Sequence, residues 1–260
     1  MIFNVSNKSI FMKKCGFTLV EGDSFKILKK FEEKSIDMIF ADPPYFLSGN
    51  GITCKSGKMV SVNKAKWDEK KDINNKLSFN RKWIKLSKTV LKDNGTIWVS
   101  GTFHNIYSIG VALELEGFEI INNITWRKTN PPPHLARKAF THSTETILWA
   151  KKLGSRYTFN YNEMKIENNN KQMKDVWESS VTKPTEKRCG KHPTQKPLWL
   201  LERIIKASTN KDDLILDPFN GSGTTGIACK LLNRNYIGID NVKEYLEISK
   251  RRYDLINLGE

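Results

Sequence analysis

The sequence predicts an α/β fold in which one sheet of seven strands is covered by helices. Short apolar runs of strand length alternate along the chain with stretches of helical periodicity, which is typical of this class. The 260 residues suffice for one large domain, and no internal repeat interrupts the alternation. The seven predicted strands span residues 16–20, 36–41, 96–100, 120–126, 145–150, 214–217 and 236–240.

Helices between these strands are predicted by apolar residues that recur three or four positions apart and so share one helix face. Residues 46–75 and 151–192 lack this periodicity and are rich in polar and basic side chains. Long irregular segments in a compact domain are usually functional, so we expect both to contact a substrate. Lys250, Arg251 and Arg252 are interpreted as a charged helix end. The apolar stripes are Phe79-Trp83-Leu86-Val90, Ile106-Ile109-Leu113 and Leu198-Leu201-Ile205.

The composition argues against several classes of protein. No uninterrupted apolar stretch approaches the roughly 18 residues of a membrane span. Lysines interrupt the N-terminal segment, so we expect no secretory signal. The four cysteines lie far apart without a CxxC pair, which favours neither a zinc site nor a disulfide framework. We therefore expect a cytoplasmic protein whose site uses no metal.

The chain is strongly basic, with a formal net charge of +15. Lys and Arg outnumber acidic residues by nine to three in residues 46–82 and by eleven to five in residues 151–200. Such clustering favours a surface that binds a phosphate backbone, although a genome rich in lysine codons would also raise the charge. Charge alone does not separate DNA from RNA or from an acidic protein.

A glycine-rich motif, DPFNGSGTTG at residues 217–226, follows a predicted strand and opens a helix. Gly221 and Gly223 let the backbone turn tightly and approach a ligand closely, and the amides at the start of the helix then face that ligand. Asp240 ends the next predicted strand, where it can accept hydrogen bonds from ribose hydroxyls. This unit predicts a site for a nucleoside cofactor.

The chemistry of that cofactor is indicated by the residues before the first glycine. Gly221, Gly223 and Gly226 match the dinucleotide fingerprint GxGxxG, which leaves a NAD-dependent oxidoreductase as an alternative. However, the Asp217 carboxylate would repel a pyrophosphate, whereas it would attract the ammonium and sulfonium of S-adenosylmethionine. The motif therefore favours S-adenosylmethionine.

A second motif, Asp42-Pro43-Pro44-Tyr45, follows the predicted strand 36–41 and so lies where open α/β sheets bind ligands. The Asp42 carboxylate and the Pro43 carbonyl could accept both hydrogens of an exocyclic amine and aim its lone pair at a methyl donor. The prolines stiffen the loop, and Tyr45 offers a ring on which an extruded base could stack. Alone the tetrapeptide could be a turn, but beside the glycine-rich unit it is specific.

Together these motifs resemble those of the beta-class amino-methyltransferases of bacterial restriction–modification systems, and most closely the GATC-specific adenine enzymes of the DpnA type. The catalytic motif precedes the cofactor loop by 175 positions, which is the order of that class. The resemblance covers nearly the whole chain and implies a class I S-adenosylmethionine-dependent methyltransferase, with a permuted, Rossmann-like, seven-stranded mixed sheet and helices on both faces. It implies one catalytic domain over residues 1–260, with DNA-contacting insertions at about 46–80 and a target-recognition region at about 128–190.

The resemblance also implies roles for individual residues. Residues 191–197, KHPTQKP, are similar to the segment that contacts the methionine part of the donor, so Lys196 is a candidate partner for the donor carboxylate. Asp23 matches a residue that contacts the cofactor adenine, although on local grounds it would cap a helix. Residues 130–133 and 140–143 are similar to stretches that flank the base pocket. The catalytic residues are Asp42, Pro43, Pro44 and Tyr45; the cofactor residues are Asp23, His192, Thr194, Gln195, Lys196, Asp217, Phe219, Asn220, Gly221, Ser222, Gly223, Thr224, Thr225 and Asp240; and the DNA-binding residues are Arg127, Lys128, Asn130, Arg137, Lys138, Phe140 and His142.

The predicted function is transfer of a methyl group to adenine N6 in DNA at GATC, with single-stranded DNA as a further substrate. A DPP rather than an SPP start favours adenine N6 over cytosine N4. Cytosine N4, RNA adenine and an inactive DNA-binding subunit remain alternatives. Related enzymes often form homodimers, but no feature of this sequence decides the oligomeric state.

Overall fold

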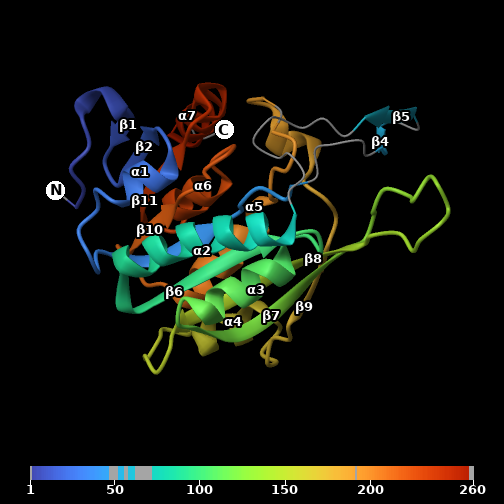
Figure 1. The fold of residues 1–260 in the computed structure, drawn as a ribbon, viewed down its shortest axis with the longest axis horizontal. Helices are drawn as coiled ribbons and strands as arrows, with labels where there is room; N and C mark the ends of the chain where they lie inside the picture. The colour runs from blue at the N-terminus through green and yellow to red at the C-terminus, as the bar shows by residue number, and fades with distance from the viewer. Residues whose placement is uncertain (1, 47–51, 56–57, 62–71, 191, 258–260) are drawn as a thin grey trace.

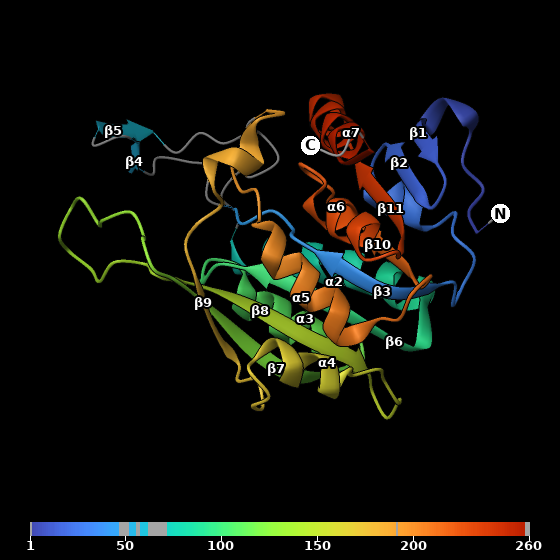
Figure 2. The same ribbon diagram turned by 180° about the vertical axis from the view of Figure 1, so that it is seen from behind.

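A nine-stranded mixed sheet forms the centre of the molecule, with helices on both of its faces (Figures 1 and 2). The structure is a computed structural model and describes residues 2–46, 52–55, 58–61, 72–190 and 192–257. The strand order is β1-β2-β11-β10-β3-β6-β8-β7-β9. The strands are β1 (Ile10–Lys14), β2 (Phe17–Glu21), β3 (Ile36–Ala41), β6 (Leu91–Gly101), β7 (Phe118–Lys128), β8 (Thr144–Lys152), β9 (Val176–Ser179), β10 (Leu214–Asp217) and β11 (Asn235–Asp240).

The helices divide between the two faces of the sheet. The apolar stripes predicted from the sequence lie on α2, α3 and α5, and alternate residues of β3, such as Ile39 and Phe40, enter the opposite cores. Helices α1, α2 and α3 cover the face seen in Figure 1, and α4, α5, α6 and α7 cover the face seen in Figure 2. Their bounds are α1 (Ser24–Leu28), α2 (Ile73–Val90), α3 (Ile106–Leu115), α4 (Tyr161–Glu167), α5 (Leu198–Ser208), α6 (Thr224–Leu231) and α7 (Lys243–Asn257); 3-10 turns lie at Asn7–Ser9 and Pro184–Lys187.

All seven predicted strands are present, but the count of seven was wrong. The two additional strands, β1 and β9, lie at the two ends of the sheet. An edge strand pairs on one side only, and each of these two buries a single residue, Met12 in β1 and Trp177 in β9. Their apolar runs are short, three residues in β1 and two in β9, and give a weaker signal than most of the others.

The segments expected to be irregular contain some regular structure. Residues 151–192 include α4 and β9, and residues 46–75 include the antiparallel hairpin of β4 (Ile52–Lys55) and β5 (Lys58–Ser61). The rest of the predicted insertion at 46–80 either begins α2 or lies outside the described residues. Strand β8, inside the predicted recognition region 128–190, pairs with β6 and β7 in the sheet.

The direction of chain winding reverses between β10 and β3. From β3 the chain crosses by α2 to its parallel neighbour β6, and from β10 it crosses by α6 in the other direction to β11. Strands β3 and β10 are themselves parallel neighbours, with Leu216 opposite Ile39. The carboxyl ends of two such strands form the crevice in which open α/β sheets bind ligands, and both predicted motifs follow these two strands.

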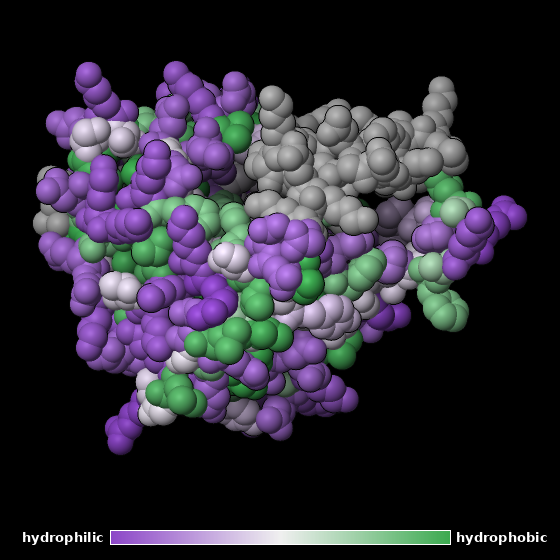
Figure 3. Space-filling model, in the orientation of Figure 1, coloured by the Kyte–Doolittle hydropathy of each residue, from purple (hydrophilic) through white to green (hydrophobic). Residues whose placement is uncertain are grey.

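The surface over α3 carries an apolar patch (Figure 3). Tyr107, Val111 and Leu115 recur every fourth residue on this helix and are 74%, 50% and 55% exposed. Their spacing places them on one helix face, opposite the face that Ile109 and Leu113 bury in the core. Among the described residues, no helix has both the length and the hydrophobicity needed to cross a membrane.

Candidate active site

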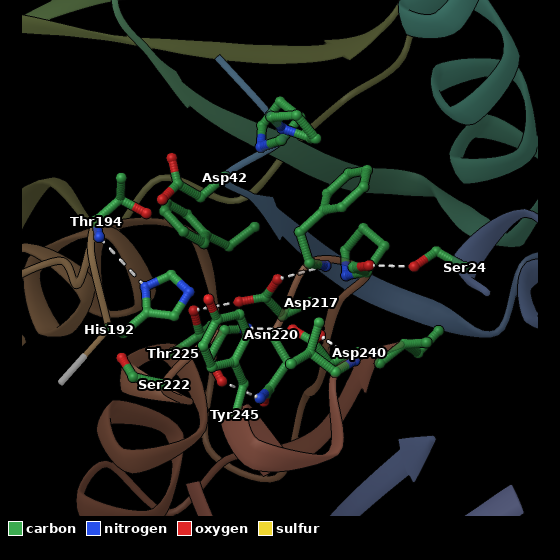
Figure 4. A pocket seen from close by; sticks show the side chains of 18 of the residues that line it. Ser24, Asp42, His192, Thr194, Asp217, Asn220, Ser222, Thr225, Asp240 and Tyr245 are labelled. Atoms are coloured by element: carbon green, nitrogen blue, oxygen red, sulfur yellow. Dashed lines mark hydrogen bonds between the residues drawn. The ribbon is translucent and has the colours of Figure 1, made fainter. Parts of the chain in front are cut away.

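A cavity of about 440 Å³ at the ends of β3 and β10 is lined by both sequence motifs (Figure 4). This volume lies in the usual range of small-molecule sites. All four residues of the predicted catalytic motif line it. Every residue that we assigned to the cofactor also lines it except Gly223, which faces Ser249 on α7 instead. Two motifs that are 175 positions apart therefore share one site.

The glycine loop is held in an unusual backbone conformation between β10 and α6. Gly221 and Gly223 have φ of 50° and 73°, a region that residues with a Cβ rarely adopt. A Cβ on Gly223 would lie 1.9 Å from Ser249 Oγ, and one on Gly221 would lie 3.1 Å from the His192 ring. The loop is therefore closed against α7 on one side and against the cavity wall on the other.

Asp217 is a buried carboxylate that accepts hydrogen bonds from neutral groups. Its Oδ2 accepts a hydrogen bond from the Thr225 hydroxyl at 2.6 Å, and its Oδ1 accepts one from the Phe219 amide at 3.0 Å. Burial raises the pKa of Asp217 to about 7, against these two hydrogen bonds. No ion pair to this carboxylate occurs among the described residues. A ligand that brings an ammonium or a sulfonium would supply the missing charge.

Asp240 holds the turn that follows β11 as well as the glycine loop. Its Oδ2 accepts from the Gly221 amide at 2.7 Å and its Oδ1 accepts from the Val242 amide at 2.9 Å. Burial raises the pKa of Asp240 to about 6. A carboxylate has about four acceptor positions, so hydrogen bonds to ribose hydroxyls at this cavity wall stay a prediction.

The segment before α5 forms the wall near Asp42. The His192 ring packs edge-on against Tyr245 at 4.3 Å, and its Nδ1 accepts from the Thr194 amide at 3.4 Å. Gln195 is buried, and its Oε1 has no hydrogen-bond partner among the described residues. An unpaired buried acceptor is costly, so it fits a ligand that donates a hydrogen bond. Asp23, at the other end, caps α1 through the Lys26 amide and also lines the cavity.

Asp42 is engaged through both carboxylate oxygens. Its Oδ1 accepts from the Tyr45 hydroxyl at 2.5 Å and its Oδ2 from the Lys196 ammonium at 2.6 Å, while that ammonium also donates to the Tyr45 oxygen at 2.6 Å. Lys196, predicted to bind a donor carboxylate, is thus bound to the catalytic motif in this structure. Tyr45 is only 5% exposed, so stacking of a base on its ring stays a prediction.

A chain of buried hydrogen bonds from two asparagines holds the Pro44 carbonyl of the catalytic loop. Asn105, just before α3, donates from its side chain to the Pro44 carbonyl at 2.8 Å and accepts from Asn80 on α2 at 2.8 Å. The Pro43 carbonyl accepts no hydrogen bond from the described residues. Pro43 lines the cavity, so acceptance of a ligand hydrogen bond by this carbonyl stays a prediction.

Four buried or half-buried charges surround the catalytic loop. Lys196 lies 3.6 Å from Glu145 Oε2, and Lys128 donates to Glu145 Oε1 at 2.6 Å. Burial raises the pKa of Asp42 against the lowering effect of Lys196. Burial opposes the charge on Lys196, but the carboxylates of Asp42 and Glu145 outweigh it and raise the pKa of this lysine. Each partner of this ion pair therefore favours the charged form of the other, against the effect of burial.

The residues assigned to DNA lie outside the cavity, on β7 and the loop that follows it. This loop, residues 129–143, projects from the body on the same side as the β4–β5 hairpin in both ribbon views. Arg137 and Lys138 are exposed on it, and Phe140 is 96% exposed. Three other assignments have partners within the protein: Arg127 pairs with Glu178, Lys128 with Glu145, and Asn130 accepts from the Val181 amide. His142 stacks on Phe103 at 4.5 Å.

Sequence reasoning missed three residues that hold the site. Asn105 and Glu145 carry no local signal, because their partners come from other elements. Arg252 is not part of a solvated helix end as expected: it is 8% exposed and donates to the Ser222 carbonyl at 2.8 Å and the Thr224 hydroxyl at 2.8 Å. Its helical spacing from the buried Ser249 could have placed it on the inner face of α7.

Comparison with known proteins shows the family of this chain. A family model described as DNA methylase, N6_N4_Mtase, matches residues 36–251. The chain is 61% identical over 236 residues to the Type II methyltransferase M2.LlaDCHI of Lactococcus lactis subsp. cremoris, covering 90% of this chain and 88% of that protein. It is 60% identical over 241 residues to the Type II methyltransferase M2.DpnII of Streptococcus pneumoniae, covering 92% and 90% of the two chains.

Solved structures share the fold. The M1.HpyAVI–SAM complex is similar with a TM-score of 0.70 and 31% sequence identity, covering 92% of this chain and 99% of that one. The cytosine-N4-specific PvuII DNA methyltransferase is similar with a TM-score of 0.74, over 91% of this chain and 86% of that one. At 19% identity the second likeness shows the fold alone. The predicted methyltransferase fold class is thereby confirmed.

Proposed function

Because this chain belongs to the N6/N4 family of DNA methylases, we propose that it transfers a methyl group from S-adenosylmethionine to adenine N6 in DNA. The target site is GATC, with single-stranded DNA as a further substrate; this specificity rests on the resemblance of the sequence to enzymes of the DpnA type. The observation that supports the reaction is the shared cavity, in which an amine-binding carboxylate and a cation-binding carboxylate face the same space.

The donor end of the cavity fits S-adenosylmethionine. When bound, this cofactor supplies a methyl group made electrophilic by a sulfonium. Asp217 offers a carboxylate to the positive groups, and the unpaired Gln195 Oε1 offers a further acceptor for the ammonium. Asp240 and Asp23 line the opposite end, where a nucleoside would lie. The tight glycine loop brings the start of α6 close to the ligand.

The acceptor end of the cavity fits an extruded base. The Asp42 carboxylate and the open Pro43 carbonyl can each accept one hydrogen of the amine, which concentrates the lone pair on nitrogen. Asn105 fixes the Pro44 peptide and so the direction in which these two acceptors point. This chain's contribution to the reaction is therefore positioning of the amine in line with the methyl group.

Mass analysis of methylated nucleosides tests the proposal. The purified protein is incubated with S-adenosylmethionine and an oligonucleotide that contains one GATC, as a duplex and as a single strand. We expect N6-methyladenine to form in both substrates, and no further methyl transfer when the target adenine is already N6-methylated. N4-methylcytosine, methylation of RNA alone, or donor binding without any transfer would each overturn the assignment.

We also propose that the protein acts as a homodimer in the cytoplasm, where its DNA substrate is found. The apolar stripe of Tyr107, Val111 and Leu115 on α3 supports an interface there, because an exposed patch of this kind usually marks a contact surface. Light scattering of the purified protein should give the mass of a dimer, and Val111→Glu should give that of a monomer. A monomeric wild type would exclude the interface.

A further inference from the structure

Glu145 is a buried carboxylate beside the reaction site, and none of the steps above uses it. It is the second residue of β8, opposite Trp126 of β7, and its side chain is 12% exposed. Lys128 satisfies its Oε1, but its Oε2 is buried and has no hydrogen-bond partner among the described residues. That open acceptor lies 3.6 Å from the Lys196 ammonium.

Lys196 occupies a position that a target amine must share. Its ammonium bonds Asp42 Oδ2, while the Tyr45 hydroxyl bonds Asp42 Oδ1. An amine that donates to Asp42 competes with these two donors for the carboxylate lone pairs. Because a charge-assisted hydrogen bond spans about 2.8 Å, the ammonium has to move by less than about 1 Å to bond Glu145 Oε2 instead.

We propose that Lys196 and Glu145 act as positioning residues for Asp42: the ammonium holds the carboxylate in the free protein and moves onto Glu145 Oε2 when the target amine binds. The inference rests on the proposed transfer to an amine at Asp42. The carboxylates of Asp42 and Glu145 and the ammoniums of Lys196 and Lys128 form a group of four charges whose sum is zero. The shift keeps the net charge of this set at zero and leaves the Asp42 carboxylate hydrogen-bonded to the amine and to the Tyr45 hydroxyl.

The two residues have opposite electrostatic effects on Asp42. Burial raises the pKa of Asp42 most, Lys196 lowers it, and Glu145 raises it. Tyr45 from the same loop donates to Asp42, and Asp217 faces it from β10. Since Asp42 accepts the amine hydrogen as a carboxylate, activity is lost as pH falls through its pKa. Lys196→Met should therefore move the acid limb of the rate profile to higher pH, and Glu145→Gln should move it to lower pH.

Titration of Asp42 in the protein without ligand tests the pair directly. Carbon-13 NMR of labelled aspartate, with the Asp42 signal assigned by its loss in Asp42→Asn, gives this pKa in each variant. Matched controls come from the ion pair between Lys151 and Glu119, whose charged atoms lie 2.9 Å apart. This pair joins β8 to β7 and does not line the cavity. Lys151→Met and Glu119→Gln should leave the Asp42 titration unchanged, and thermal unfolding shows whether each variant is folded.

Single-turnover methylation across pH tests the movement of the ammonium. Glu145→Gln removes the charge that receives Lys196, so we expect the rate at its optimum to fall about tenfold with KM for DNA nearly unchanged. Glu145→Asp and Lys196→Arg keep the charges and should restore part of the rate. Shifts of the Asp42 titration in the same direction in Lys196→Met and Glu145→Gln, or none in either, would overturn the inference. If the wild type methylates no adenine, the proposed function fails, and the titration still decides the pair.

Discussion

The buried carboxylates of Asp42 and Asp217 lie at the carboxyl ends of two neighbouring parallel strands, but their partners differ. Asp42 after β3 has a cation of its own, since Lys196 bonds it at 2.6 Å. Asp217 at the end of β10 accepts from a hydroxyl and an amide and has no cation among the described residues, and burial raises its pKa to about 7. The carboxylate that lacks a protein cation suits a positively charged ligand, whereas the one already paired suits a neutral amine. In the proposed reaction, this difference in charge would separate the donor end of the cavity from the acceptor end.

Removal of the Asp42 carboxylate should abolish methyl transfer but leave donor binding unchanged. Asp42→Ala leaves the amine without its charged acceptor, so we expect the transfer rate to fall by at least about 1000-fold. Donor binding should persist, because the Asp217 side is intact. Tritium transfer and calorimetry measure the two effects. Asp93→Ala, which removes an exposed carboxylate paired with Lys34, should change neither, and full activity in Asp42→Ala would refute the assigned role.

Distortion of the glycine loop should break the donor side. Gly223→Ala adds a Cβ at φ 73° that meets Ser249 Oγ, so we expect a loss of about 3 kcal/mol in unfolding free energy and a donor affinity about tenfold lower or worse. Gly154 has the same φ with nothing within 4 Å of its Cβ position. Gly154→Ala therefore measures the backbone cost alone, about 1 kcal/mol. Equal losses in the two variants, by urea unfolding, would mean that the contact with α7 does not matter.

The pH dependence of donor binding should sharpen the comparison. Because Asp217 is protonated below a pKa of about 7, the affinity for S-adenosylmethionine should improve as pH rises through that value and then level off. Asp217→Asn should flatten this profile and weaken binding about tenfold at pH 8, as measured by calorimetry. A wild-type affinity that is constant from pH 5.5 to 8.5 would contradict this account.

The raised pKa of Asp217 also affects the stability of the protein without ligand, which falls with rising pH whereas donor affinity increases. The folded protein holds the Asp217 proton up to about pH 7, whereas the unfolded chain releases it near the ordinary value of 3.8. The stability contributed by this group therefore falls as pH rises between these values. Asp217→Asn should remove that loss, so its melting temperature should decline less from pH 5 to pH 8 than that of the wild type.

The smallest expected effect belongs to the projecting loop that would lead DNA to Asp42. Removing two phosphate contacts with Arg137→Ala and Lys138→Ala should weaken DNA binding several-fold and reduce the salt slope by about 2, with donor binding unchanged. Lys13→Ala and Lys14→Ala, on β1 at the far end of the sheet, are the matched control. Fluorescence anisotropy over a range of salt concentrations compares the two double variants. Equal salt slopes would show that the loop does not contact DNA phosphates.

The sequence by itself determined the central strands, the helices between them and the position of both motifs at strand ends. Buried strands and helix stripes are periodic in apolar residues, and turns that approach a ligand need glycine or proline, so these features can be read locally. Edge strands β1 and β9 lack that periodicity because half of their environment is solvent.

Only the tertiary structure decided which charges meet. The ion pair between Asp42 and Lys196 spans 154 positions, and Glu145 reaches the site from β8, which carries no motif. Nothing local distinguishes such residues from exposed ones, since their pKa values and partners follow from burial and from the packing of distant strands. The sheet places these side chains together, and because they are buried away from water, each charge shifts the pKa of its neighbours.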